Sequence, residues 1–143
     1  MNRIAVQFLD QGLHRVLFDA MPMPMPVFVV DEDVRVMEYN VAAARLFGSD
    51  KPAVLNRRGG EVWHCLHVGE TPEGCGHARA CRDCVVRESV RAAAAGHRVS
   101  RRWTEMELTL KGTPSKFSVR VSCQPFTFKN NSLVLLILEG LND

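Results

Sequence analysis

The chain has 143 residues, which is enough for one domain with its own core and too few for two ordinary domains. Hydrophobic residues make up 46% and charged residues 24%, so the composition excludes global disorder. The net charge of +2 gives no electrostatic case for nucleic acid or an anionic membrane as a partner. No apolar run is long enough to span a bilayer, and we expect a cytoplasmic protein without membrane insertion.

An amphipathic helix is predicted over residues 4–20, where apolar residues recur at helical spacing. The Met-Pro repeat at 21–26 ends this helix, because proline has no amide hydrogen to donate and disfavours helix in the residue before it. We therefore divide the chain into an N-terminal helix, residues 1–21, and one domain, residues 22–143. The helix is expected either to serve dimerisation or signalling or to cover the sheet of its own domain.

A hairpin and a short helix are predicted to open the domain. Two β-rich runs at residues 27–30 and 34–39 flank an acidic turn at 31–33, which indicates a hairpin. Asn40 follows at the position of an N-cap, and its side chain suits the start of a helix at 41–47.

Residues 49–82 are rich in glycine and are predicted to be irregular. A loop of this length inside a compact domain needs something to order it. A helix is predicted at 83–95, with Arg87 and Arg91 on a solvated face and Glu88 paired with Arg91.

Three strands are predicted to close the chain, at residues 102–110, 116–125 and 133–139, with turns at 112–115 and 129–132. Two leading and three trailing strands can form one five-stranded antiparallel sheet. With helices from the middle segment on one face, the predicted class is α+β. We expect Cys123 to be a buried free cysteine, and Trp63 and Trp103 to lie in the core or in a pocket wall.

The order of these elements resembles the PAS domain family. The resemblance covers about residues 22 to 140 and rests on the opening hairpin, on the Asn-x-Ala-Ala-x-x-Leu-Phe-Gly pattern of residues 40–48, and on the three closing strands. It implies a sensory or interaction module with a pocket between the sheet and the central helices. It also implies that an N-terminal helix such as residues 4–20 supports dimers.

Four of the five cysteines lie within twenty residues: Cys65, Cys75, Cys81 and Cys84. Thiolates are preferred ligands of zinc and of iron–sulfur clusters, and four of them complete a tetrahedral zinc site or a cluster. The last two form Cys-x-x-Cys at the predicted helix start, where the positive end of the helix dipole favours thiolate. We predict these four as metal ligands. A redox disulfide or inert thiols are the alternatives.

The insert at residues 60–84 resembles a cysteine-rich subgroup of bacterial PAS sensors, on the segments Gly60–Cys65, Gly74–Gly76 and Cys81–Cys84. Because only one Cys-x-x-Cys is present, a standard zinc ribbon is excluded. The histidines near the insert, His64, His67 and His77, are expected to be surface residues or alternative ligands.

We therefore expect a non-enzymatic PAS-type sensory and signal-transduction module. It would sense redox state or oxygen through a cysteine-ligated iron–sulfur cluster, with zinc as the alternative cofactor. Two other functions stay open: a cofactor-free dimerisation domain with structural zinc or a disulfide, and a small-molecule sensor. The expected partner is a second copy of the chain or an output domain such as a histidine kinase.

Overall fold

A computed structural model describes residues 24–47, 54–76, 81–82, 84–110, 112–128 and 130–141. The predicted helix over residues 4–20 lies outside these ranges. Within them, no helix has the length and apolar character needed to cross a bilayer.

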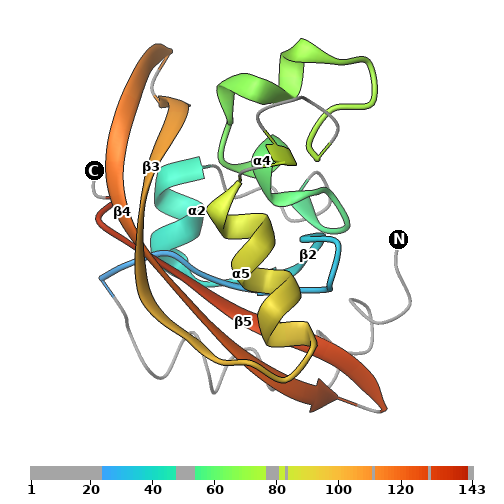
Figure 1. The fold of residues 1–143 in the computed structure, drawn as a ribbon. Helices are drawn as coiled ribbons and strands as arrows, with labels where there is room; N and C mark the ends of the chain where they lie inside the picture. Colours follow the sequence, from blue (N-terminus) through green and yellow to red (C-terminus); the bar gives the residue numbers. More distant parts are fainter. Residues whose placement is uncertain are drawn as a thin grey trace.

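The described residues form an α+β domain, which confirms the predicted class. Its elements are β1 (Val27–Val30), β2 (Val36–Tyr39), α2 (Val41–Phe47), α4 (Gly59–Val62), the 3-10 helix η2 (Leu66–Glu70), α5 (Val85–Ala94), β3 (Val99–Leu110), β4 (Thr113–Phe128) and β5 (Asn131–Glu139). The strands form one antiparallel sheet in the order β2-β1-β5-β4-β3 (Figure 1). The predicted five-stranded sheet is confirmed.

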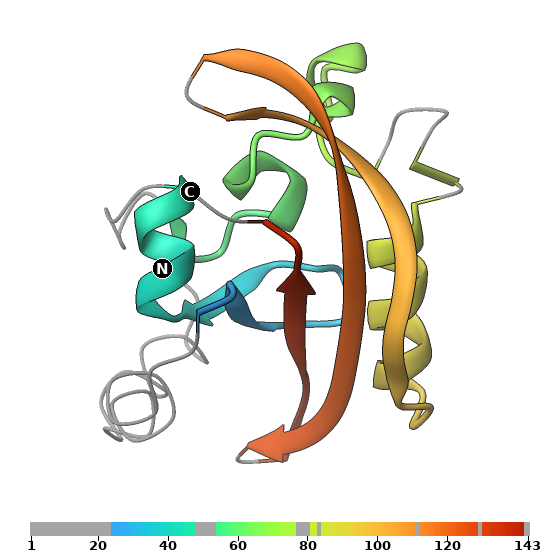
Figure 2. The same cartoon turned by 90° about the vertical axis from the view of Figure 1, so that its left-hand side faces the viewer.

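The closing strands are longer than predicted because their hairpin turns are tighter. β3 and β4 remain paired up to Leu110 and Thr113, so the predicted turn at 112–115 is wrong except at its start. Gly112 has a φ of +79°, which glycine adopts without the steric cost that a side chain brings. β4 and β5 pair up to Phe128 and Asn131. Figure 2 shows the resulting β3–β4 hairpin as a long curved ribbon beside α5.

The main core lies between one face of the sheet and the helices α2, α4 and α5, as predicted. It joins side chains of the sheet to Phe47 of α2, Val62 of α4 and Val90 of α5. Phe28 of β1 is fully buried at its centre, with its ring 6.0 Å from that of Phe47 and 5.4 Å from that of Trp63. Burial of this apolar surface provides the main favourable free energy of folding.

Asn40 fixes the start of α2, which confirms its predicted role as N-cap. Its Oδ1 accepts hydrogen bonds from the backbone N–H groups of Ala43 and Val27, both at 3.0 Å. Its Nδ2 donates to the carbonyl oxygen of Met25 at 2.9 Å. One buried side chain thus fastens the helix to the beginning of β1.

Candidate functional site

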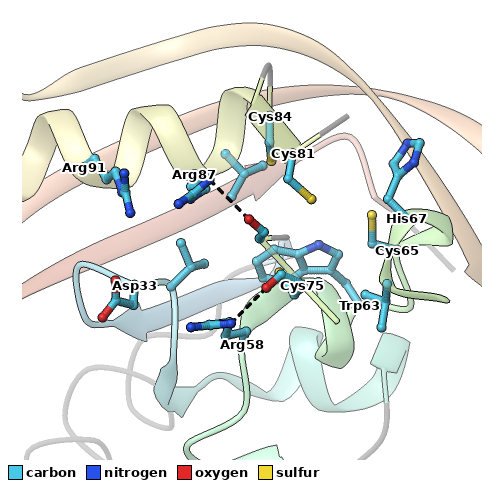
Figure 3. A pocket seen from close by; sticks show the side chains of 15 residues that line it. Asp33, Arg58, Trp63, Cys65, His67, Cys75, Cys81, Cys84, Arg87 and Arg91 are labelled. Carbon is cyan, nitrogen blue, oxygen red and sulfur yellow. Dashed lines mark hydrogen bonds between the residues drawn. The ribbon is translucent and has the colours of Figure 1, made fainter. Parts of the chain in front are cut away.

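The four clustered cysteines line one cavity of about 280 Å³, which we call the cysteine cavity. Its walls come from α5, from the segment around α4 and η2, and from the turn at Cys75 and Gly76. Figure 3 shows the thiols of Cys65, Cys81 and Cys84 on one side of Trp63 and the arginines toward the other end. A second cavity of about 130 Å³ shares Cys65, Cys81 and Cys84 with it, so these three lie between two hollow spaces.

Cys65 lies between α4 and η2 and is tied to the edge of the sheet. Its backbone forms an isolated antiparallel bridge with Leu108 of β3, and its N–H donates to the carbonyl of Gly60 at 2.8 Å. The adjacent bond from the N–H of Thr109 to the carbonyl of His64 measures 2.9 Å. The Cys65 side chain forms no cap hydrogen bond at the start of η2, although the backbone N–H of His67 acts to lower the pKa of its thiol.

Cys75 occupies a turn between two glycines with positive φ, Gly74 at +81° and Gly76 at +92°. Its thiol accepts a hydrogen bond from the N–H of Gly60. A Cβ on Gly60 would lie 2.7 Å from the Cys75 Sγ and 3.4 Å from the Cys65 Cβ. Glycine at position 60 therefore lets the backbone approach two of the four cysteines closely.

Cys84 is the N-cap of α5, and its N–H donates to the carbonyl of Cys81 at 3.3 Å. The Cys84 side chain forms no cap hydrogen bond, but the backbone N–H groups of Val86 and Arg87, in the first turn of the helix, favour its thiolate form. The helix begins at Val85, two residues later than predicted. Both cysteines of the Cys-x-x-Cys motif therefore precede α5.

Burial decides the ionisation of the thiols. The pKa of Cys65 is raised from 9.0 to about 11, mainly by loss of hydration and to a smaller extent by the thiols of Cys84, Cys75 and Cys81. Burial also raises the pKa of Cys75 and the pKa of Cys84. For Cys84 the expected shift toward thiolate is wrong, because desolvation by burial outweighs the opposite effect of the backbone amides at the helix start.

The donor set fits a soft metal in its chemistry. Backbone N–H groups act on the thiols of Cys65, Cys75 and Cys84 in the direction that favours thiolate, which helps ligation once a metal has displaced their protons. In the part of the chain that the structure describes, however, no three Cys, His, Asp or Glu side chains converge closely enough to share one ion. Ligation therefore requires these side chains to close inward on the cavity.

Three arginines line the same cavity, a feature that sequence reasoning missed. Arg58 precedes α4 and donates from Nη1 to the carbonyl of Cys75 at 3.0 Å. Arg87 and Arg91 lie one turn apart on α5, and Arg87 Nη1 donates to the carbonyl of Gly76 at 3.4 Å. Arg87 is half-buried, so its predicted solvated position is wrong, whereas Arg91 is exposed as predicted.

The predicted pair of Glu88 with Arg91 is also wrong. Glu88 Oε2 lies 3.4 Å from Nη2 of Arg102 on β3, because the neighbouring strand carries an arginine on the side of the helix that Glu88 faces.

The histidines of the insert and Trp63 differ in how they lie relative to the cavity. His67 lines the cavity and faces two carboxylates, with Nδ1 2.9 Å from Glu70 and Nε2 3.7 Å from Glu107. His64 is exposed, and His77 lies outside the described residues. Trp63 is buried in the cavity wall, as predicted.

Trp103 is not in the core. It is 53% exposed and donates from Nε1 to Ser118 Oγ at 2.7 Å across the hairpin, so its predicted place in the core is wrong. Cys123 is buried as predicted, and burial raises its pKa to about 12.

A family comparison matches residues 9–124 to the MmyB-like transcription regulator ligand binding domain. No curated protein matches the chain by sequence.

Solved structures share the fold across nearly the whole chain. The PAS domain of an HTR-like protein from Haloarcula marismortui is 22% identical, with a TM-score of 0.53 and coverage of 94% of this chain and 99% of that one. The PAS domain of BvgS from Bordetella pertussis is 20% identical, with a TM-score of 0.56 and coverage of 94% and 88%. The PAS domain of NR(II) from Vibrio parahaemolyticus is 12% identical, with a TM-score of 0.56 and coverage of 84% and 92%. The chain therefore has the PAS fold.

Proposed function

Since the chain belongs to the family of MmyB-like transcription regulator ligand binding domains, we propose that it is a PAS-type sensory domain that receives its signal in the cysteine cavity. The proposed signal is redox state or oxygen, read through a cysteine-ligated iron–sulfur cluster. Zinc on the same four cysteines is the alternative cofactor. This role requires no catalysis.

The observation that carries this proposal is the meeting of four thiols from separate segments at one cavity. Cys65 comes from the start of η2, Cys75 from a glycine turn, and Cys81 and Cys84 from the start of α5. A cluster held there would supply sensitivity to oxygen and to electrons. The chain's own contribution is to present sulfur, to direct amide N–H groups at three of the thiols, and to limit water by burial.

A second candidate function is a metal-free sensor of a small molecule. The specific observation in its favour is that the thiols line a hollow space instead of meeting at a point, next to the buried ring of Trp63. Apolar cavities with a few polar groups are the usual form of ligand sites.

We further propose that the domain passes its signal to a second copy of the chain or to an output domain such as a histidine kinase. Among the solved structures with the same fold is a domain of a sensory box sensor histidine kinase/response regulator from Geobacter sulfurreducens. Residues 1–21, which precede the described structure, are the proposed element for dimerisation or signalling.

Metal analysis of protein purified without oxygen tests the cofactor. Iron with acid-labile sulfide and visible charge-transfer absorption supports the cluster, whereas stoichiometric zinc in colourless protein replaces the cluster by zinc. Protein that carries neither, even after reconstitution with iron and sulfide, overturns metal binding and leaves the small-molecule sensor. Cys81→Ser is expected to abolish binding, and Cys123→Ala, at a buried cysteine outside the cavity, is expected to retain it.

A further inference from the structure

We propose that Arg58, Arg87 and Arg91 form a subsite for the carboxylate of a small organic acid, whose body occupies the cysteine cavity. The inference rests on the proposed function in one respect only, namely that this cavity receives the signal. It does not require a metal.

The first argument is the spacing of two arginines on α5. Arg87 and Arg91 stand at positions i and i+4, where like charges face each other and destabilise a helix. The acidic residue nearest to them on the helix, Glu88, pairs with Arg102 instead. Among the described residues, no carboxylate forms an ion pair with Arg87 or Arg91, so their mutual repulsion is not relieved within this part of the chain.

The second argument is the direction in which the guanidinium groups point. Arg58 and Arg87 donate to two successive carbonyls, those of Cys75 and Gly76, which draws both side chains to the cavity wall and away from solvent (Figure 3). The bond from Arg87 uses one of the five N–H donors of its guanidinium. Planar guanidinium groups match carboxylate oxygens in pairs, which makes arginine the preferred side chain for this recognition.

The third argument is the balance of charge along the cavity. Among the described residues, the only acidic one that lines the cavity is Asp33, which already lies 3.4 Å from Nη1 of Arg35. His67, which also lines the cavity, faces Glu70 and Glu107. An end lined by three arginines, next to the apolar wall of Trp63, therefore suits an anion with an apolar body.

The fourth argument is size. A cavity of about 280 Å³ lies just below the usual range for ligand pockets, which starts at about 300 Å³, so its ligand must be small. Trp63 gives it a flat apolar wall, and the buried Val86 of α5 also lines it. A small acid with a flat or compact body fits this space.

Three matched pairs of ligands test the subsite: benzoate and benzamide, phenylacetate and phenylacetamide, and cyclohexanecarboxylate and its amide. Each pair differs in charge and little in shape. We expect calorimetry and thermal unfolding of the reduced, metal-free protein to show binding of at least one acid, with its amide about tenfold weaker. The absence of a preference for the acid in all three pairs overturns the proposal.

Variants locate the subsite. The double variant Arg87→Gln, Arg91→Gln is expected to lose the preference for the acid, and Arg120→Gln, at an exposed position of β4, is expected to keep it. A bound acid should also slow alkylation of Cys65 and Cys75 by iodoacetamide in the parent protein. An unchanged preference in the double variant, with its fold intact by circular dichroism, contradicts the assignment.

The Cys81→Ser variant separates this inference from metal binding. Under the proposed function it loses the metal, yet it keeps the three arginines and should still prefer the acid. Loss of metal with acid binding retained supports both proposals, whereas acid binding that disappears from every metal-free sample overturns the subsite alone.

Discussion

The sheet and the cysteine-bearing segment, residues 54–84, are built on different principles. The strands pair along continuous ladders, of which β3–β4 and β4–β5 are the longest. The described part of the segment joins the sheet through two isolated bridges, Arg35 with Arg58 and Cys65 with Leu108. Short helices and turns fill the distance between them.

This contrast separates stability from chemistry. Sheet and helices bury an apolar core that holds the fold, while the segment supplies four thiols and Arg58 to the cavity. Regions with few regular hydrogen bonds open at lower free energy than the core. A segment that must close around a ligand is therefore best kept outside the regular sheet.

The largest effect is expected from the core. Phe28→Ala removes a fully buried ring that touches the rings of Phe47 and Trp63, and it should lower the free energy of unfolding by about 3–5 kcal/mol. Urea unfolding measures the change. The control Val41→Ala, at a residue 48% exposed, should stay within about 0.5 kcal/mol. Equal effects of the two would contradict the placement of the core.

A smaller effect tests whether the segment itself is packed. An alanine at Gly59 would place its Cβ against the ring of Trp63, and we expect a loss of about 1–3 kcal/mol. Gly69→Ala meets no atom within 4 Å and serves as the control, with little expected change. If both variants match the parent in urea unfolding, the segment is looser than the structure indicates.

The pH dependence of stability offers a third comparison, because the sheet and the segment each contain a shielded thiol. Burial raises the pKa of Cys123 in the sheet to about 12 and the pKa of Cys65 in the segment to about 11. Above pH 9.0 the unfolded thiols ionise while these folded thiols keep their protons, so stability is full below pH 9 and falls as the pH rises toward 11 or 12.

A single protected thiol contributes at most about 1.4 kcal/mol per pH unit to this fall, and Cys65, which is only half-buried, contributes less because solvent screens it. Urea unfolding between pH 8 and 10.5 measures the slope. Cys123→Ala should flatten it more than Cys65→Ala. A larger change from Cys65→Ala would mean that the segment is the better shielded region.

The smallest effect is expected at the surface. Arg101 and Glu139 form a bidentate salt bridge, with Nε–Oε1 and Nη2–Oε2 both at 3.1 Å. Both side chains are exposed. Glu139→Gln should cost about 0.2–1 kcal/mol, and 1 M salt should reduce the difference. A cost that persists in high salt would show that the pair is shielded from solvent.

The sheet could be predicted because its strands carry period-two apolar patterns that match one buried face. Val119, Val121 and Cys123 alternate as the sequence indicates, and all three are buried. The strand ends were predicted less well, since residues 113–115 are polar or proline and belong to β4 through pairing with β3 alone. Local sequence does not record such cross-strand pairing.

The cavity could be predicted from the sequence less completely than the sheet. The spacing of the cysteines indicates the right segment, but the position of Cys75 depends on positive φ at Gly74 and Gly76 and on its close approach to Gly60, which have no periodic signal. Helical periodicity places Arg87 and Arg91 opposite the apolar stripe and predicts both as exposed, which holds for Arg91 and not for Arg87. The signal that the sequence does offer is two like charges four residues apart.

The bridge between Cys65 and Leu108 also has a consequence for solubility. β3 is an edge strand, and an exposed edge can recruit strands from other molecules. The bridge and the bond between Thr109 and His64 occupy this edge at one end. Charged side chains of Arg101, Arg102, Glu105 and Glu107 discourage pairing along the remainder. Detachment of the segment would lengthen the unpaired edge of β3. The bridge that positions Cys65 therefore also reduces the tendency of the chain to aggregate.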